Sequence, residues 1–175
     1  MQALGRKSVD DFRDGAKMPF VFVLDNIRSG LNIGSVFRTA DAFAFSKVVL
    51  CGITAQPPHR EILKTALGST DSVAWEWMEN TSAAVLALKS AGYKVLAVEQ
   101  TSQPIWLQEL VVTENEAIAF VLGNEVDGVD ADVLALCDGA VEIPQFGTKH
   151  SLNVAVAAGI VAWEAVRQVG FTPQP

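Results

Sequence analysis

Short runs of apolar, β-forming residues alternate with helical patterns along this chain, and this alternation most constrains its fold. FVFVL (Phe20–Leu24) and AIAFVLG (Ala117–Gly123) are short and uniformly apolar, which is typical of buried strands. Because helices separate the strands, we expect an α/β fold with a mostly parallel sheet flanked by helices. The other expected strands are 47–51, 73–78, a run ending near Glu99 and 140–144; the expected helices are 32–45, 82–91, 130–136 and 152–168, with a helical turn at 62–66.

The chain is long and apolar enough to build one core. It has 175 residues, of which 50% are hydrophobic, so a domain can form without disulfides or metals. We expect a single domain at 20–170, a polar N-terminal arm at 1–19 and a tail at 171–175. Cys51 and Cys137 lack CxxC or metal-ligand spacing, which indicates reduced thiols in a cytoplasmic protein. We expect neither a secretory leader nor a membrane span.

The charge balance limits how this chain could meet nucleic acid. Its formal net charge is −7 and its pI is about 4.7, which argues against non-specific coating of nucleic acids. An RNA substrate is not excluded, because local charge decides binding rather than the total. His59, Arg60 and Lys64 form a small basic cluster, although such a cluster alone is more often a solvated loop.

Four polar segments follow expected strands of the sheet. They are LDNIRSGLNIG, EQTSQP, LGNEVDG and IPQFGTKHS. In open parallel sheets, ligands bind beyond the carboxyl ends of the strands, where such segments meet. We therefore expect the functional site at this edge of the sheet.

Ordinary structural roles explain part of these segments. Asn32 and Ser151 are suitable N-caps for the helices that follow them, and Arg38 suits a solvated position paired with Asp41. The glycines of the first segment do not form GxGxxG or a P-loop, so a dinucleotide or nucleoside-triphosphate site is disfavoured. His150 has no partner at metal-ligand spacing, so no metal is expected.

The stretch FVLGNEVDGVD is less easily explained by turn formation alone. A strand-to-helix turn accounts for Gly128 and for Asp130 as a helix cap. It does not account for Asn124 and Glu125, and Gly123 would let a ligand approach the backbone closely.

The last expected helix is apolar on nearly every side until Glu164. Such a helix either lies deep in the fold or packs against a partner chain. We favour a dimer interface that covers part of it.

Taken together, three segments resemble the SpoU (TrmH-type) family of SPOUT RNA ribose methyltransferases. NIGSVFRTADAF matches the first motif of the family, VLGNEVDG the second and IPQFGTKHSLNVAVAAG the third. The resemblance covers residues 20–168, and the three motifs occur in the family's order and spacing.

The resemblance implies a fold, a cofactor and a partner. The fold would contain a deep C-terminal trefoil knot, and the protein would form a homodimer through helices that include the last one. The cofactor would be S-adenosylmethionine. The positions that match its binding residues are Val98, Glu99, Leu122, Gly123, Ile143 and Leu152.

The resemblance also implies roles in methyl transfer to a ribose 2′-hydroxyl of tRNA or rRNA. Arg38 would act at the hydroxyl, through its charge rather than as a literal base, because a free guanidinium is a very weak base. Asn32 would hold its loop, and Glu125 would order the second and third motifs by hydrogen bonds. Ser151 and Asn153 would be the polar groups at the reaction centre.

Arg60 and Lys64 would contact RNA phosphates, and residues 1–19 are too short for the additional RNA-binding domain of some family members. Two other functions stay open. One is a knotted methyltransferase that acts on an RNA base, which the first and third motifs disfavour. The other is a non-catalytic RNA-binding dimer that keeps the cofactor pocket.

Overall fold

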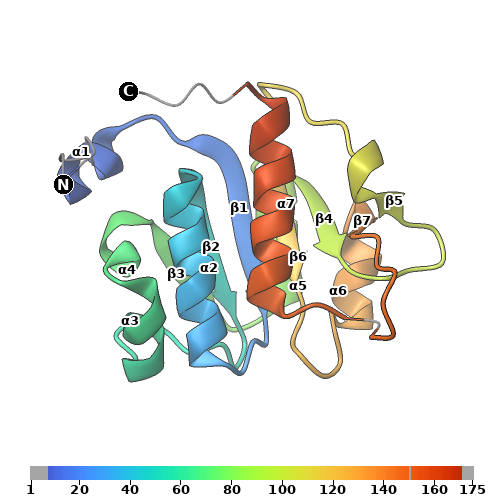
Figure 1. Cartoon of the computed structure of the whole chain (residues 1–175), viewed down its shortest axis with the longest axis horizontal. Coiled ribbons are helices and arrows are strands. Elements are labelled where there is room, and N and C mark those ends of the chain that lie inside the picture. Colours follow the sequence, from blue (N-terminus) through green and yellow to red (C-terminus); the bar gives the residue numbers. More distant parts are fainter. Residues whose placement is uncertain (1–7, 150, 171–175) are drawn as a thin grey trace.

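The computed structural model describes residues 8–149 and 151–170, which form a seven-stranded sheet with helices on both faces (Figure 1). The sheet order is β3-β2-β1-β6-β4-β7-β5, and every neighbouring pair of these strands is parallel. The expected parallel α/β architecture is therefore confirmed. The strands are β1 Met18–Asp25, β2 Phe45–Cys51, β3 Trp75–Met78, β4 Lys94–Val98, β5 Ile105–Trp106, β6 Ile118–Leu122 and β7 Gly139–Glu142.

Helices cover the two faces of the sheet unequally. Helices α2, α3 and α7 pack on the face that is in front in Figure 1, and α5 and α6 pack on the other. Within the described part of the chain, no helix is long and apolar enough to cross a membrane. The helices are α1 Val9–Asp14, α2 Gly30–Ala42, α3 Arg60–Ala66, α4 Ser69–Ser72, α5 Thr81–Ser90, α6 Ala131–Leu136 and α7 Val154–Gln168, with a 3₁₀ turn at Leu107–Glu109.

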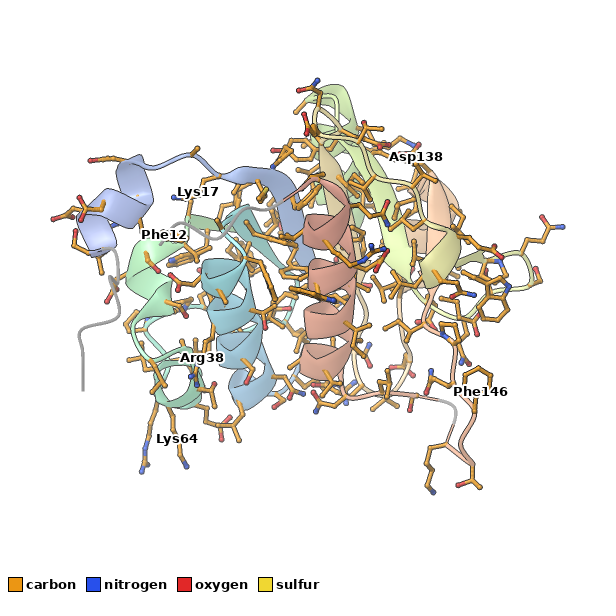
Figure 2. The ribbon with its side chains drawn as sticks, turned by 45° about the horizontal axis from the view of Figure 1, so that its top comes forward. Phe12, Lys17, Arg38, Lys64, Asp138 and Phe146 are labelled. Atoms are coloured by element: carbon orange, nitrogen blue, oxygen red, sulfur yellow. The ribbon has the colours of Figure 1, made fainter. Side chains whose placement is uncertain are left out.

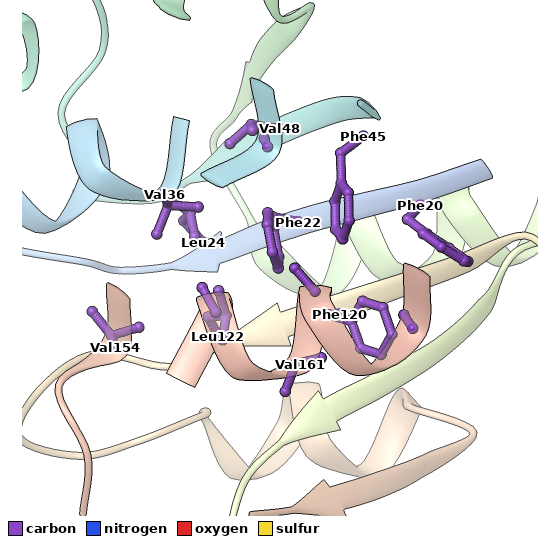
Figure 3. Close-up of a cluster of buried hydrophobic side chains, with 14 of the residues drawn as sticks. Phe20, Phe22, Leu24, Val36, Phe45, Val48, Phe120, Leu122, Val154 and Val161 are labelled. Atoms are coloured by element: carbon purple, nitrogen blue, oxygen red, sulfur yellow. The ribbon is translucent and has the colours of Figure 1, made fainter. Parts of the chain in front are cut away.

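Strand β1 shows how the apolar run in the sequence produces two cores. Successive side chains of a strand point to opposite faces. Phe20, Phe22 and Leu24 therefore pack toward α2 and α7, whereas Val21 and Val23 pack toward α5 and α6. Figure 3 shows the first cluster, in which the rings of Phe22 and Phe45 are stacked with centroids 4.4 Å apart.

Two expected helix caps are wrong. The side chain of Ser29 accepts a hydrogen bond from the amide of Asn32 and caps α2, so Asn32 lies inside the first turn. Asn153 caps α7, two residues after the expected Ser151, because the helix begins only at Val154. In both cases the residue directly before the first helical residue takes the role.

Other differences concern short elements, and some predicted segments lie outside the described residues. Helix α1 and strand β5 were not expected, because six and two residues give too short a pattern to detect. Residues 1–7, His150 and 171–175 lie outside the described residues, and they include the whole predicted tail and part of the predicted arm. The trefoil knot stays a prediction of the family resemblance.

Candidate functional site

A pocket of about 510 Å³ opens at the carboxyl ends of β4, β6 and β7. This volume lies within the usual range of small-molecule sites. Three of the four polar segments expected there contribute to it. Its lining residues come from 98–100, 122–128, 141–145 and 151–157, and they include every residue that the resemblance assigns to the cofactor: Val98, Glu99, Leu122, Gly123, Ile143 and Leu152.

The chemistry of the pocket wall is divided into two parts. One part is apolar and includes Val98, Leu122 and Leu152. The other carries carboxylates, namely Glu99, Glu125, Asp127 and Glu142. Such a wall suits a ligand that combines an apolar ring with a positive charge, because the carboxylates attract a cation.

Glu99 fixes the second motif from the neighbouring strand. Its Oε2 accepts a hydrogen bond from the amide of Val129 at 3.1 Å, and its Oε1 accepts one from Gln100 at 2.9 Å. Gly128 has a φ of +72°, and a Cβ there would lie 2.3 Å from Glu99 Oε2. The positive φ favours glycine at 128, and the Glu99 carboxylate holds the loop through the amide of Val129.

The sequence suggests that Gly123 lets a ligand approach the backbone. In the structure, Gly123 instead lets another part of its own loop approach. A Cβ at this position would lie 2.1 Å from the carbonyl carbon of Gly128 and 2.2 Å from the amide nitrogen of Val129. The missing side chain therefore lets the loop fold back on its own backbone. Gly123 also lines the pocket, but its need for glycine is explained by the loop.

Hydrogen bonds through Asn32 join the three motifs. Its Nδ2 donates to Glu125 Oε1 at 2.8 Å, and its Oδ1 accepts from Asn153 Nδ2 at 3.1 Å. Asn153 Oδ1 in turn accepts from the amide of Ala155 at 2.9 Å and caps α7. One amide side chain thus connects residues that are 93 and 121 positions away in sequence.

These contacts keep the Glu125 carboxyl ionised. Partial burial raises its pKa, but the hydrogen bonds that it accepts from the Asn32 side chain and from backbone amides, including that of Arg28, outweigh this effect. The net result is a pKa below its usual value. Ser151 is exposed and lines the same pocket.

Arg38 lies outside this pocket, in a second groove between α2 and α3. Lys64 lines the same groove, so the structure brings these two predicted residues together (Figure 2). The expected pair between Arg38 and Asp41 is wrong, because Asp41 instead accepts a hydrogen bond from the Ser72 hydroxyl. Arg60 is exposed at the start of α3 and does not line the groove.

Helix α7 is buried along one side only. Its small residues pack on the sheet, whereas Val156, Ile160 and Trp163 are exposed by 51%, 36% and 57%. The Trp163 ring lies 6.3 Å from that of Phe43, which also lines the Arg38 groove. The alternative that the helix lies deep in this fold is therefore wrong for the single chain.

Asp25 is a site-supporting residue that the sequence analysis missed. It is 1% exposed, and its Oδ1 accepts from the Thr81 hydroxyl at 2.6 Å while its Oδ2 accepts from the amide of Asp130 at 3.1 Å. It therefore fixes the far end of the second-motif loop. The only signal in the sequence is an acidic residue that directly ends an apolar strand, FVFVLD. Among the described residues, no group of three or more His, Cys, Asp or Glu side chains could hold a metal ion.

The fold and the pocket define an α/β domain with a pocket of small-ligand size at the carboxyl ends of a parallel sheet. The family model described as "SpoU rRNA Methylase family" matches residues 19–163. The chain belongs to this family, which confirms the resemblance in the three motifs.

Individual relatives show how far the similarity extends. The chain is 30% identical over 166 residues to the 23S rRNA (guanosine-2′-O-)-methyltransferase RlmB of Vibrio cholerae, covering 94% of this chain and 66% of the relative. An AdoMet-bound rRNA methyltransferase from Sinorhizobium meliloti has a TM-score of 0.81 at 27% identity, over 91% of this chain and 61% of that one.

A third match has nearly the same length as this chain. A structure described as giving insights into the 2′-OH methylation of C/U34 on tRNA has a TM-score of 0.75 at 28% identity, over 85% of this chain and 95% of that one. The chain thus spans less than two thirds of some larger relatives and almost all of this one.

Proposed function

We propose that this chain is an S-adenosylmethionine-dependent methyltransferase that methylates a ribose 2′-hydroxyl in tRNA or rRNA. The observation that carries the proposal is the pocket whose three motifs are joined through Asn32, Glu125 and Asn153. The printed activities of the matched relatives, which act on rRNA or tRNA riboses, support the same reaction.

The volume of the pocket and its apolar and acidic lining support binding of this cofactor. The adenine ring would lie against the apolar wall, with Leu152, Leu122 and Val98. When bound, S-adenosylmethionine supplies an electrophilic methyl group on a positively charged sulfur. The nearby carboxylates of Glu99 and Glu142 favour that cation and the amino group.

Arg38 and Lys64 would hold the RNA at the site of methyl transfer. Methylation of a ribose 2′-hydroxyl would require the hydroxyl to give its proton to solvent or to a neighbouring RNA phosphate, and the bound cofactor would supply the methyl group. The guanidinium of Arg38 is permanently protonated, so it would clamp a phosphate and stabilise the negative charge developing on the oxygen. Much of the remaining rate enhancement would come from holding the ribose hydroxyl in position beside the cofactor.

The active form would be a homodimer in the cytoplasm. The exposed apolar side chains of α7 would bury against a second copy. Because Phe43 touches Trp163 and also lines the Arg38 groove, that second copy would lie close to Arg38. The two free cysteines agree with a reducing compartment.

Methyl transfer with a matched pair of variants tests this proposal. Wild-type protein should transfer labelled methyl groups from S-adenosylmethionine to unmodified tRNA or rRNA. Leu152→Arg should abolish cofactor binding, measured by calorimetry, because it puts a cation and bulk into the pocket. Val111→Arg, at a side chain that is 70% exposed and does not line the pocket, should bind normally. Cofactor binding without transfer to either RNA would instead favour the non-catalytic dimer.

A further inference from the structure

Phe146 stands almost free in solvent. It is 99% exposed, more than any other large apolar side chain of the described residues. Figure 2 shows it on a loop that projects from the body of the fold, away from α7. A phenyl ring has no polar atom that can hydrogen-bond to water. Burial of this ring against a partner would therefore contribute favourably to the free energy of binding.

The loop that carries Phe146 also builds the pocket. Ile143 and Gln145 line the pocket on one side of Phe146 in the sequence, and Ser151 and Leu152 line it on the other. The ring is therefore attached to the mouth of the pocket, where a substrate of the proposed reaction must arrive.

The two segments at the mouth of the pocket differ in charge. The described residues 143–149, which carry Phe146, include Lys149 and no carboxylate, although Glu142 directly before them lines the pocket. The second-motif loop on the other side carries Glu125 and Asp127, both exposed. A polyanion would be repelled by that side and accepted on the Phe146 side.

We propose that Phe146 stacks on an unpaired nucleobase of the RNA, next to the ribose that is methylated, with Lys149 beside its phosphate. This inference rests on the proposed function and deepens it, because it makes a single-stranded or flipped-out nucleotide the substrate. An aromatic ring can stack on any base whose face is free, whereas bases in a duplex are covered by their neighbours. A second copy of the chain is the less suitable occupant, since the exposed apolar face of α7 lies elsewhere (Figure 2).

Direct RNA binding tests the inference independently of catalysis. The probe is a fluorescein-labelled single-stranded RNA of mixed sequence, compared by anisotropy with the same strand in a duplex. Wild type should bind the single strand more tightly. Phe146→Ala and Phe146→Leu should weaken single-strand binding roughly tenfold, as expected for one lost base stack, and Phe146→Tyr should bind like wild type. The Kd for S-adenosylmethionine should be the same in all four proteins.

Three outcomes would overturn the inference. One is a Leu variant that binds single strands like wild type, because the contact would then be only apolar. Another is an Ala variant that dissociates into monomers, because the ring would then seat against a second copy. The third is equal binding of single strand and duplex. Failure of the proposed function has a different signature, namely wild-type protein that binds RNA but not S-adenosylmethionine.

Discussion

The side chain of Arg38 is exposed in a groove that it shares with Lys64, and it does not line the pocket at the carboxyl ends of β4, β6 and β7. We predict that Arg38→Ala lowers the methyl-transfer rate by about 10²–10⁴-fold, because an oxyanion-stabilising charge is lost. The Kd for S-adenosylmethionine should not change. Arg13→Ala, at an exposed arginine on α1, is the matched control and should keep full activity. Wild-type turnover by the Arg38 variant would remove this residue from the reaction.

The Glu125 carboxylate should support the site in a pH-dependent way. Its pKa is lowered in the folded chain, so its contribution to stability is present above its ordinary pKa of 4.5 and is lost as the pH falls through the folded value. Glu125→Gln should therefore lower the Tm between pH 5 and 8. The difference from wild type should shrink below about pH 4.5. A difference that stays constant down to pH 3 would show that the charge contributes nothing.

Residues inside continuous motifs could be predicted from the sequence, whereas long-range partners could not. Glu125 stands out because a strand-to-helix turn does not require it, whereas Asn32 and Asn153 are assigned through the resemblance of their motifs to the SpoU family. The role of Asp25 was missed because its partners, Thr81 and Asp130, are 56 and 105 positions away. Only the three-dimensional fold reveals which donors a buried carboxylate meets.

At the scale of single elements, α7 should carry the dimer interface. Ile160→Asp puts a charge into the exposed apolar face of the helix and should convert the dimer into monomers, measured by light scattering. Leu86→Asp, at a side chain on α5 that is 51% exposed, is the control and should not change the mass. A dimeric Ile160 variant would place the interface elsewhere.

The stability of the second-motif loop, residues 122–128, should depend on Gly123. Gly123→Ala forces a Cβ against the backbone of Gly128, and we predict a loss of about 1–3 kcal/mol in the free energy of unfolding. Gly147→Ala is the matched control, because nothing lies within 4 Å of a Cβ there. Denaturant titration compares the two, and an unaffected Gly123 variant would contradict the close packing of the loop.

The elements differ in how well the sequence predicts them. Buried central strands such as β1 and β6 are apolar on both faces and are easily detected. The edge strand β5 has two residues and depends on pairing with β7, so no local pattern marks it. The topology of the sheet, and any knot in it, depends on the order in which distant strands pair.

At the scale of the whole molecule, an acidic protein should contact RNA through few phosphates. Arg38, Arg60, Lys64 and Lys149 are the basic residues that we place near the RNA. Four phosphate contacts predict a slope of about −3 for log Kobs against log salt concentration on single-stranded RNA. A slope of about −6 or steeper would indicate a much larger basic surface than the one proposed.

The position of the transferred methyl group tests the central claim most directly. RNA methylated by the wild-type protein with labelled S-adenosylmethionine would be digested to nucleosides, and each labelled nucleoside would be fragmented by mass spectrometry. Our account predicts that the label stays with the ribose fragment and that the base fragment keeps its unmodified mass. A label on the base fragment would contradict ribose 2′-O-methylation and would identify a base methyltransferase instead.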